Sequence, residues 1–182
     1  PAVVRDYREL DGTFDRVASI GMSEHVGRDG LERYFRSAWD RLAPGGLMLN
    51  HAISRGPRGT APDPASRDET FIQRYVFPDG EIVDLAETIR AAEAVGFEVR
   101  DVEDLREHYA TTLRHWSARL EDRWDDAVRI AGEERARIWR LFMAGAAHQF
   151  ARGRLSVHQV LLGRPDRDGR VEIPPTRDDL YA

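Results

Sequence analysis

The fold is decided by the stretch Phe14-Asp15-Arg16-Val17-Ala18-Ser19-Ile20, which runs directly into Gly21-Met22-Ser23-Glu24-His25-Val26-Gly27. The first segment is mostly apolar, which is typical of a strand that is covered on both faces in a parallel sheet. The second segment is rich in glycine and polar side chains, and such residues end a strand. The sequence therefore predicts a strand over 14–20 whose carboxyl end opens into a polar loop.

A helix and a second strand follow this loop. A helix from Gly30 to Leu42 would carry one apolar stripe of Leu31, Tyr34, Phe35, Ala38 and Leu42. The Pro-Gly-Gly sequence at 44–46 ends this helix, and Leu47 to Ile53 is a second buried strand. A strand, a helix, a Pro-Gly turn and a strand at this spacing indicate one right-handed βαβ unit.

Further along the chain, the pattern continues to alternate between helices and strands. We predict a short strand over 2–5, a helix over 84–95, a strand over 97–101, a largely helical stretch over 105–152 and a last strand over 155–162. The Gly/Pro-rich stretch 55–70 is either a lid or a plain surface loop. The fold class is therefore α/β, with one domain over 1–165 and a loose tail over 166–182.

The composition narrows the classes of function. The chain has 182 residues, which fits one domain, and a net charge of −5, which argues against a nucleic-acid binder with a broad basic surface. It contains no cysteine and no lysine. Disulfides, thiolate metal sites, thiol nucleophiles, Schiff-base lysines and Walker-type phosphate loops are therefore excluded. No window approaches the roughly 18 consecutive apolar residues of a membrane span, and the amino end has no signal-peptide pattern.

Three polar side chains fall where the first two strands end. Glu24 follows the first strand, and His51 and Ser54 lie at the end of the second. Ligands of open α/β sheets bind at the carboxyl ends of the strands, so these residues are the candidate site. A structural alternative is that Glu24 caps the following helix and His51 is a hydrogen-bonded imidazole in the core.

Several motifs along the chain form a set that is more specific than any one of them. They are Asp6-Tyr7-Arg8, the stretch 14–27 quoted above, Leu42-Ala43-Pro44-Gly45-Gly46, Leu49-Asn50-His51-Ala52-Ile53, Tyr75-Val76-Phe77-Pro78-Asp79-Gly80, Tyr109-Ala110-Thr111-Thr112-Leu113 and Val157-His158-Gln159-Val160. As a set, they resemble the cyclopropane-fatty-acyl-phospholipid synthases, a family that includes the mycolic acid cyclopropane synthases and related fatty acid methyltransferases. The resemblance covers most of the chain to about Pro165.

The resemblance implies a class I S-adenosylmethionine-dependent methyltransferase with a Rossmann-like fold. This chain would hold the C-terminal part of the sheet plus inserted helices, and the N-terminal strands are absent from it. The implied reaction transfers the methyl group of S-adenosylmethionine to the cis double bond of an unsaturated fatty acyl chain of a phospholipid, with bicarbonate as the base. The product would be a cyclopropane or a methyl-branched chain.

The resemblance also implies which residues form the site. The bicarbonate ligands, and hence the catalytic residues, map onto Glu24, His51, Tyr109 and the backbone around Ile53. Glu24 would accept the bicarbonate hydroxyl, while His51 and Tyr109 would donate hydrogen bonds to its oxygens. The residues that map onto the S-adenosylmethionine contacts are Asp6, Tyr7, Arg8 and Ile20.

The chain departs from the family pattern at three positions. Ser23 stands where the family has an aromatic residue, Ala52 stands where it has threonine, and Met143 lies near the place of a cysteine found in many members. Structural roles also remain open for two site residues. Tyr109 can be a core tyrosine at an interface, and Tyr7 can be an aromatic residue at a strand end.

Two other functions and a metal site are alternatives to this interpretation. A small-molecule S-adenosylmethionine methyltransferase would share the sheet topology but would not need Glu24, His51 and Tyr109 together. A non-catalytic truncated remnant or interaction subunit is favoured by the missing cofactor-binding half. Two histidines, His25 and His51, match with Glu24 the stoichiometry of a metal site, but their spacing is unspecific and no metal is predicted.

The expected partners and location follow from the resemblance. The partners are an unsaturated phospholipid acyl chain, a peripheral membrane contact, the missing N-terminal half of the methyltransferase and, as is frequent in the family, a second copy in a homodimer. Nucleic acid is not expected. The expected location is cytoplasmic, at the inner face of the membrane. Alone, the chain is expected to bind S-adenosylmethionine weakly and to have little activity, because a doubly wound sheet without its first strands exposes an apolar face and an edge.

Overall fold

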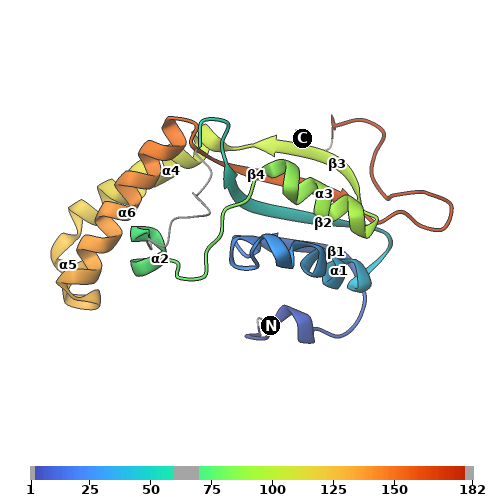
Figure 1. The fold of residues 1–182 in the computed structure, drawn as a ribbon, viewed down its shortest axis with the longest axis horizontal. Coiled ribbons are helices and arrows are strands. Elements are labelled where there is room, and N and C mark those ends of the chain that lie inside the picture. The colour runs from blue at the N-terminus through green and yellow to red at the C-terminus, as the bar shows by residue number, and fades with distance from the viewer. Residues whose placement is uncertain (1–2, 60–69, 179–182) are drawn as a thin grey trace.

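The chain is built around a mixed β-sheet. The computed structural model describes residues 3–59 and 70–178. In this part of the chain, four strands lie in the order β1-β2-β4-β3 (Figure 1). They are β1 (Phe14–Ile20), β2 (Leu42–Arg55), β3 (Glu98–Asp104) and β4 (Leu155–Gly163). β1 and β2 are parallel, whereas β4 runs antiparallel to both β2 and β3. The predicted α/β class is confirmed.

The predicted βαβ unit is present at the start of the sheet. Helix α1 (Leu31–Arg41) follows a 3-10 turn, η3 (Arg28–Gly30), and leads into the strand parallel to β1. Its apolar stripe buries Leu31, Tyr34 and Phe35. The stripe forms a helix because its residues recur every three or four positions and can all face the sheet.

β2 begins earlier than the sequence predicts, at Leu42 rather than at Leu47. The Pro-Gly-Gly sequence at 44–46 is taken into the strand, because the pairing with β1 changes register between Phe14 and Arg16. Gly46 suits this place because a Cβ there would lie 2.8 Å from the carbonyl oxygen of Asp15. The turn signal in the sequence thus marks an irregularity inside a strand, which glycine allows.

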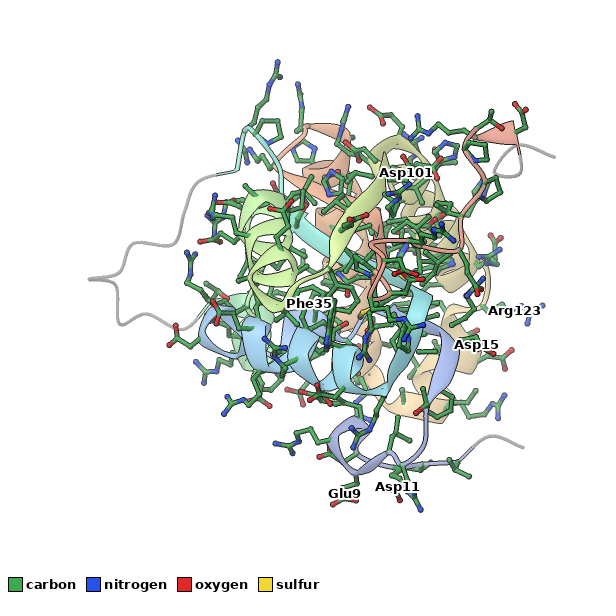
Figure 2. The ribbon with its side chains drawn as sticks, turned by 90° about the vertical axis from the view of Figure 1, so that its right-hand side faces the viewer. Glu9, Asp11, Asp15, Phe35, Asp101 and Arg123 are labelled. Atoms are coloured by element: carbon green, nitrogen blue, oxygen red, sulfur yellow. The ribbon has the colours of Figure 1, made fainter. Side chains whose placement is uncertain are left out.

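One face of the sheet is covered by α1 and α3 (Leu85–Val95) (Figure 1). Phe35 is fully buried between them and the sheet (Figure 2). The core around it includes Tyr34, Leu42, Met48, Ala92, Phe97, Val160 and Leu162. The end of α3 lies at Gly96, whose φ of +118° is in the left-handed region that favours glycine.

The opposite face of the sheet carries a second, smaller core. Val157 of β4 belongs to it, whereas Val160 and Leu162 of the same strand belong to the first core. Alternate residues of a strand point to opposite faces, so the two cores lie on opposite sides of the sheet. The second core contains Ala110, Leu113, Ala147, Phe150 and Val157, with Ile53 and Tyr109 packed against it.

The predicted helical stretch over 105–152 consists of three helices. They are α4 (Arg106–Asp122), α5 (Trp124–Ala131) and α6 (Glu133–Ala151), and they extend beyond the end of the sheet (Figure 1). Gly132, with a φ of +83°, separates α5 from α6. Within the described ranges, none of the helices combines the length and the apolarity that crossing a lipid bilayer requires.

Three short elements complete the described chain: η1 (Tyr7–Glu9), η2 (Ser23–His25) and α2 (Phe71–Tyr75). The strand predicted over 2–5 is absent from residues 3–5, which have no regular structure, and Ala2 lies outside the described residues. Asp6 instead starts η1, because its side chain accepts a hydrogen bond from the Arg8 N–H. Residues 60–69 of the predicted lid or surface loop also lie outside the described residues.

The segment after β4 returns along the start of β2. Arg164 exchanges backbone hydrogen bonds with the glycines at 45–46, and the Glu172 N–H donates to the Gly45 carbonyl oxygen at 2.9 Å. The Arg164 guanidinium also lies over the Trp39 ring, 4.9 Å from its centroid. These contacts connect the segment to both α1 and β2.

Candidate active site

Glu24 lies at the sheet edge just beyond the end of β1. The last backbone hydrogen bond between the two parallel strands runs from the Gly21 N–H to the His51 carbonyl oxygen at 2.9 Å. Gly21 has a φ of +63°, so the chain leaves the strand direction there and enters η2. The next N–H of β2 on this edge belongs to Ile53, and it donates to Glu24 Oε1 at 2.8 Å. The Glu24 side chain thus takes the place that a longer β1 would occupy.

The second carboxylate oxygen of Glu24 is in a different situation. Glu24 Oε2 is buried and has no hydrogen-bond partner among the described residues. A buried carboxylate oxygen without a donor is costly, so this atom marks a place for a ligand or a water molecule that donates a hydrogen bond. The arrangement holds one oxygen in place and leaves the other as an acceptor.

Tyr109 and Ile53 belong to the same packing cluster. Tyr109, in the first turn of α4, packs edge-on against Phe150 with 4.9 Å between the ring centroids. Both Tyr109 and Ile53 contact the second core. Burial, with the negative charge of Glu24 as the second cause, raises the pKa of the Tyr109 phenol. The phenol therefore stays protonated at neutral pH and can donate a hydrogen bond.

His51 is placed on the face of the sheet that carries this second core. It lies two residues before Ile53 in β2, so both side chains point to the same face. It is also the register partner of Ile20 at the end of β1. Among the described residues, its ring makes no hydrogen bond to Glu24 or Tyr109; His51 shares its face of the sheet with Ile53 and Tyr109.

A small pocket borders Glu24 on the other face of the sheet. Its lining combines polar and apolar side chains: Ser23, Glu24, Asn50, Ala52, Ile53, Ser54, Glu81, Val83, Leu85, Thr88, His158 and Val160. Neither His51 nor Tyr109 lines it. Ser54 Oγ lies 2.8 Å from His158 Nδ1. Burial lowers the pKa of His158, although the neighbouring Asp104 opposes this shift.

The four residues predicted to contact S-adenosylmethionine lie in two places. Ile20 ends β1 and is 70% exposed. Tyr7, in η1, is half-buried and packs edge-on against Tyr34 of α1 at 5.9 Å. Asp6 and Arg8 pair with each other, and this pairing lowers the pKa of the Asp6 carboxyl to about 2. Ile20 thus offers apolar surface beside the sheet end, while the charges of Asp6 and Arg8 are paired with each other.

Two further residues near Glu24 belong to the site, although no pattern in the sequence predicts a role for them. They are Arg28 and Glu81, which join the loop after β1 to the loop before α3. Charged side chains in surface loops are common, so spacing alone does not single them out. No group of three His, Cys, Asp or Glu side chains within residues 3–59 and 70–178 could hold a metal ion.

The family of the chain is established by comparison with known proteins. The family model described as mycolic acid cyclopropane synthetase matches residues 2–160. The chain belongs to this family. This membership confirms the resemblance that the sequence motifs carry.

Relatives within the mycolic acid cyclopropane synthetase family include a "Probable fatty acid methyltransferase" of Pseudomonas putida. The chain is 43% identical to it over 180 residues, which are 98% of this chain and 45% of the relative. The chain is also 28% identical over 167 residues to the cyclopropane-fatty-acyl-phospholipid synthase of Escherichia coli strain K12, covering 92% of this chain and 42% of that protein. The chain thus spans less than half the length of these relatives.

The fold also matches a solved member of the family. The mycolic acid cyclopropane synthase CmaA1, complexed with SAH and CTAB, superimposes with a TM-score of 0.77 at 31% identity, over 86% of this chain and 57% of that chain. The sheet and helices described above are therefore part of the S-adenosylmethionine methyltransferase fold, as predicted.

Proposed function

We propose that the protein transfers the methyl group of S-adenosylmethionine to the cis double bond of an unsaturated fatty acyl chain in a phospholipid, with bicarbonate as the base. The single observation that carries the proposal is the Glu24 carboxylate. One oxygen is held by the Ile53 N–H, and the other is buried and has no partner among the described residues. Family membership supports the reaction class.

The reaction needs a base that is held in place. S-adenosylmethionine, when bound, supplies an electrophilic methyl group. Addition of this methyl group to an alkene leaves a positive charge on the acyl chain, which is removed when a proton is lost. Glu24 Oε2 would accept the hydroxyl hydrogen of bicarbonate and so turn its other oxygens toward that proton. Tyr109, whose phenol stays protonated, would donate a hydrogen bond to the same ion, and His51 would donate another.

The residues present fit part of an S-adenosylmethionine site. Ile20 offers exposed apolar surface at the carboxyl end of β1, where ligands of such sheets bind. Tyr7 adds an aromatic ring on the α1 side of the same sheet. We assign Tyr7 to the adenine of the cofactor and Ile20 to another contact with it. Asp6 and Arg8 would fix the turn that holds Tyr7, because the Asp6 side chain accepts from the Arg8 N–H at 2.9 Å.

The product is either a cyclopropane or a methyl-branched chain, according to how the carbocation is resolved. Loss of a proton from the transferred methyl group closes the ring. If a hydride first moves from the methyl-bearing carbon to the neighbouring cationic carbon, loss of a proton from the methyl group leaves a methylene group, which a later reduction turns into a methyl branch. Ser23 and Ala52, which depart from the family pattern near the proposed bicarbonate site, favour the branched product for this chain.

The substitution Glu24→Gln tests the proposed function. Glutamine has the same shape and can still accept from the Ile53 N–H, but its amide nitrogen donates where Oε2 accepts. We expect methyl transfer by the complete natural protein to fall about 100-fold or more, since general-base catalysis contributes on that order. The measurement is mass spectrometry of the phospholipid acyl chains formed from S-adenosylmethionine and an unsaturated lipid.

A matched control is Glu133→Gln, which makes the same chemical change at an exposed ion pair with Arg137 on α6. Its activity should equal that of the unsubstituted protein. Unchanged turnover in Glu24→Gln would remove Glu24, and with it the bicarbonate role, from the proposal.

A further inference from the structure

Glu24 is held by more than the Ile53 N–H. Its backbone carbonyl oxygen accepts from the Glu81 N–H at 2.8 Å. Two residues further on, the Val83 carbonyl oxygen accepts from the Arg55 N–H at 3.0 Å. Because Arg55 and Ile53 are neighbours on the same edge of β2, these bonds close a ring through β2, Glu24 and the segment 81–83. The segment 81–83 therefore clamps the Glu24 loop against the end of β2.

The carboxylate of Glu81 fastens the same loop at a second point. Glu81 Oε2 accepts from the Arg28 N–H at 2.9 Å, and Glu81 Oε1 lies 3.7 Å from the Arg28 Nε. Arg28 also pairs with Glu87 in the first turn of α3. The Glu24 loop is thus bound to the loop before α3 through the main chain of Glu81, through its side chain and through Arg28.

The backbone between Glu24 and Arg28 is shaped to allow this contact. Gly27 has a φ of +73°, and a Cβ at this position would lie 3.1 Å from Glu81 Oε2. A residue with a side chain would be strained there and would crowd the carboxylate. The glycine lets the Arg28 N–H approach Glu81.

The pair is too exposed to have folding as its main role. The side chains of Arg28 and Glu81 are 48% and 49% exposed. Ion pairs at such sites contribute little to the free energy of unfolding, because water screens the charges. Their effect should therefore be on the geometry of the loop, to which the reacting groups are sensitive: a displacement of about 1 Å can lower a rate about 100-fold.

We propose that Glu81, together with Arg28, is a positioning residue that sets the orientation of the Glu24 carboxylate through the clamp at the end of β2. The inference rests on the proposed role of Glu24 as the hydrogen-bond acceptor for the base. Glu81 itself acts through Glu24 and does not contact the reacting atoms.

The test is a pair of substitutions in the complete natural protein. Glu81→Ala removes both side-chain contacts to Arg28 and keeps the N–H that holds the Glu24 carbonyl oxygen, so kcat should fall about tenfold while KM for the lipid stays the same. Glu81→Gln keeps an acceptor for the Arg28 N–H and should therefore retain most of the kcat of the parent protein. The melting temperature of both variants should stay within about 3 °C of the parent protein. The control Glu133→Ala removes an exposed ion pair elsewhere and should leave kcat unchanged.

A double-mutant cycle separates positioning from a general structural effect. If Glu81 acts through Glu24, then Glu81→Ala should cause no further loss of kcat in a Glu24→Gln background. Where the turnover of Glu24→Gln is too low to measure, Glu24→Asp serves as the background.

The possible outcomes distinguish the two proposals. Unchanged kcat in Glu81→Ala, or an equal loss in both backgrounds, overturns the positioning role and leaves the role of Glu24 intact. Full activity of Glu24→Gln overturns the proposed function itself, whatever Glu81→Ala does.

Discussion

Tyr34 and Asn50 form a buried polar pair beside the candidate site. The Tyr34 hydroxyl donates to Asn50 Oδ1 at 2.8 Å, and Asn50 is 1% exposed. Asn50 also lines the pocket next to Glu24. Burial raises the pKa of Tyr34, so the hydroxyl remains a donor throughout the physiological range.

We predict that Tyr34→Phe lowers the free energy of unfolding of the complete natural protein by about 1–3 kcal/mol, the cost of a buried acceptor that has lost its partner. Urea denaturation followed by circular dichroism measures this change. Tyr75→Phe, which removes the same hydroxyl from a residue that is 46% exposed, is the control and should be neutral. Equal stability of Tyr34→Phe and Tyr75→Phe would contradict the prediction.

His158 should make stability depend on pH. Burial lowers its pKa below the ordinary value of 6.5, and the groups that face the ring are the Ser54 hydroxyl and the Asp104 carboxylate. Below pH 6.5 the unfolded chain binds a proton that the folded protein resists, so stability is full above this pH and falls as the pH drops further. We expect the loss of unfolding free energy between pH 7.5 and 5.5 to be smaller in His158→Gln than in the parent protein. An identical pH dependence of the urea midpoint in both proteins would rule this out.

The sequence motifs identify which residues form the candidate site, but they do not identify the contacts that these residues make. Glu24, Ile53 and Tyr109 carry over from the family pattern, and the structure bonds Glu24 to the Ile53 N–H and packs Ile53 and Tyr109 in one cluster. The hydrogen bond between Glu24 and the Ile53 N–H could not be predicted from the sequence. It depends on β1 ending at Ile20 and on the chain leaving the strand direction at Gly21. The clamp by Glu81 could not be predicted from the sequence either, because it joins two loops that are distant along the chain.

At the scale of the elements, apolar periodicity is sufficient to predict a helix or a strand where that element is long. The stripe of α1 and the run of β1 predict both elements closely. Glycine signals are harder to interpret. The Pro-Gly-Gly sequence at 44–46 predicts a turn but lies within β2, while Gly132 divides a stretch predicted as largely helical. A glycine marks an unusual backbone, and tertiary contacts decide which kind.

Gly96 and Gly145 give a matched test of this distinction. Gly96 ends α3 with a φ of +118°, and a Cβ there would lie 3.0 Å from the Trp39 ring, whereas Gly145 lies within α6 with no atom within 4 Å of its Cβ position. We predict that Gly96→Ala lowers the free energy of unfolding by about 1–3 kcal/mol because of backbone strain. Gly145→Ala should raise it by about 0.5–1 kcal/mol through helix propensity. Thermal unfolding of both variants provides the measurement, and a change of the same sign in both would contradict the argument.

At the scale of the whole molecule, β1 is an edge strand of the described sheet. In an α/β fold of this class, an edge strand with apolar residues exposed on one face is a surface that further structure covers. Phe14 and Ile20 are 41% and 70% exposed, and both lie on the face of β1 opposite α1. The chain also spans only 45% of its relative in Pseudomonas putida.

These facts predict how the 182 residues behave alone. Ile20 is exposed beside the sheet end and Tyr7 packs on α1, so the described residues offer S-adenosylmethionine a partial contact surface rather than an enclosed pocket. Binding affinity depends on burying most of a ligand's surface, so the isolated chain should bind S-adenosylmethionine with a Kd weaker than about 100 μM. Isothermal titration of the isolated chain measures this, with circular dichroism as the check that the chain is folded. Binding in the low micromolar range by a folded chain would mean that residues 1–182 already contain a complete cofactor site.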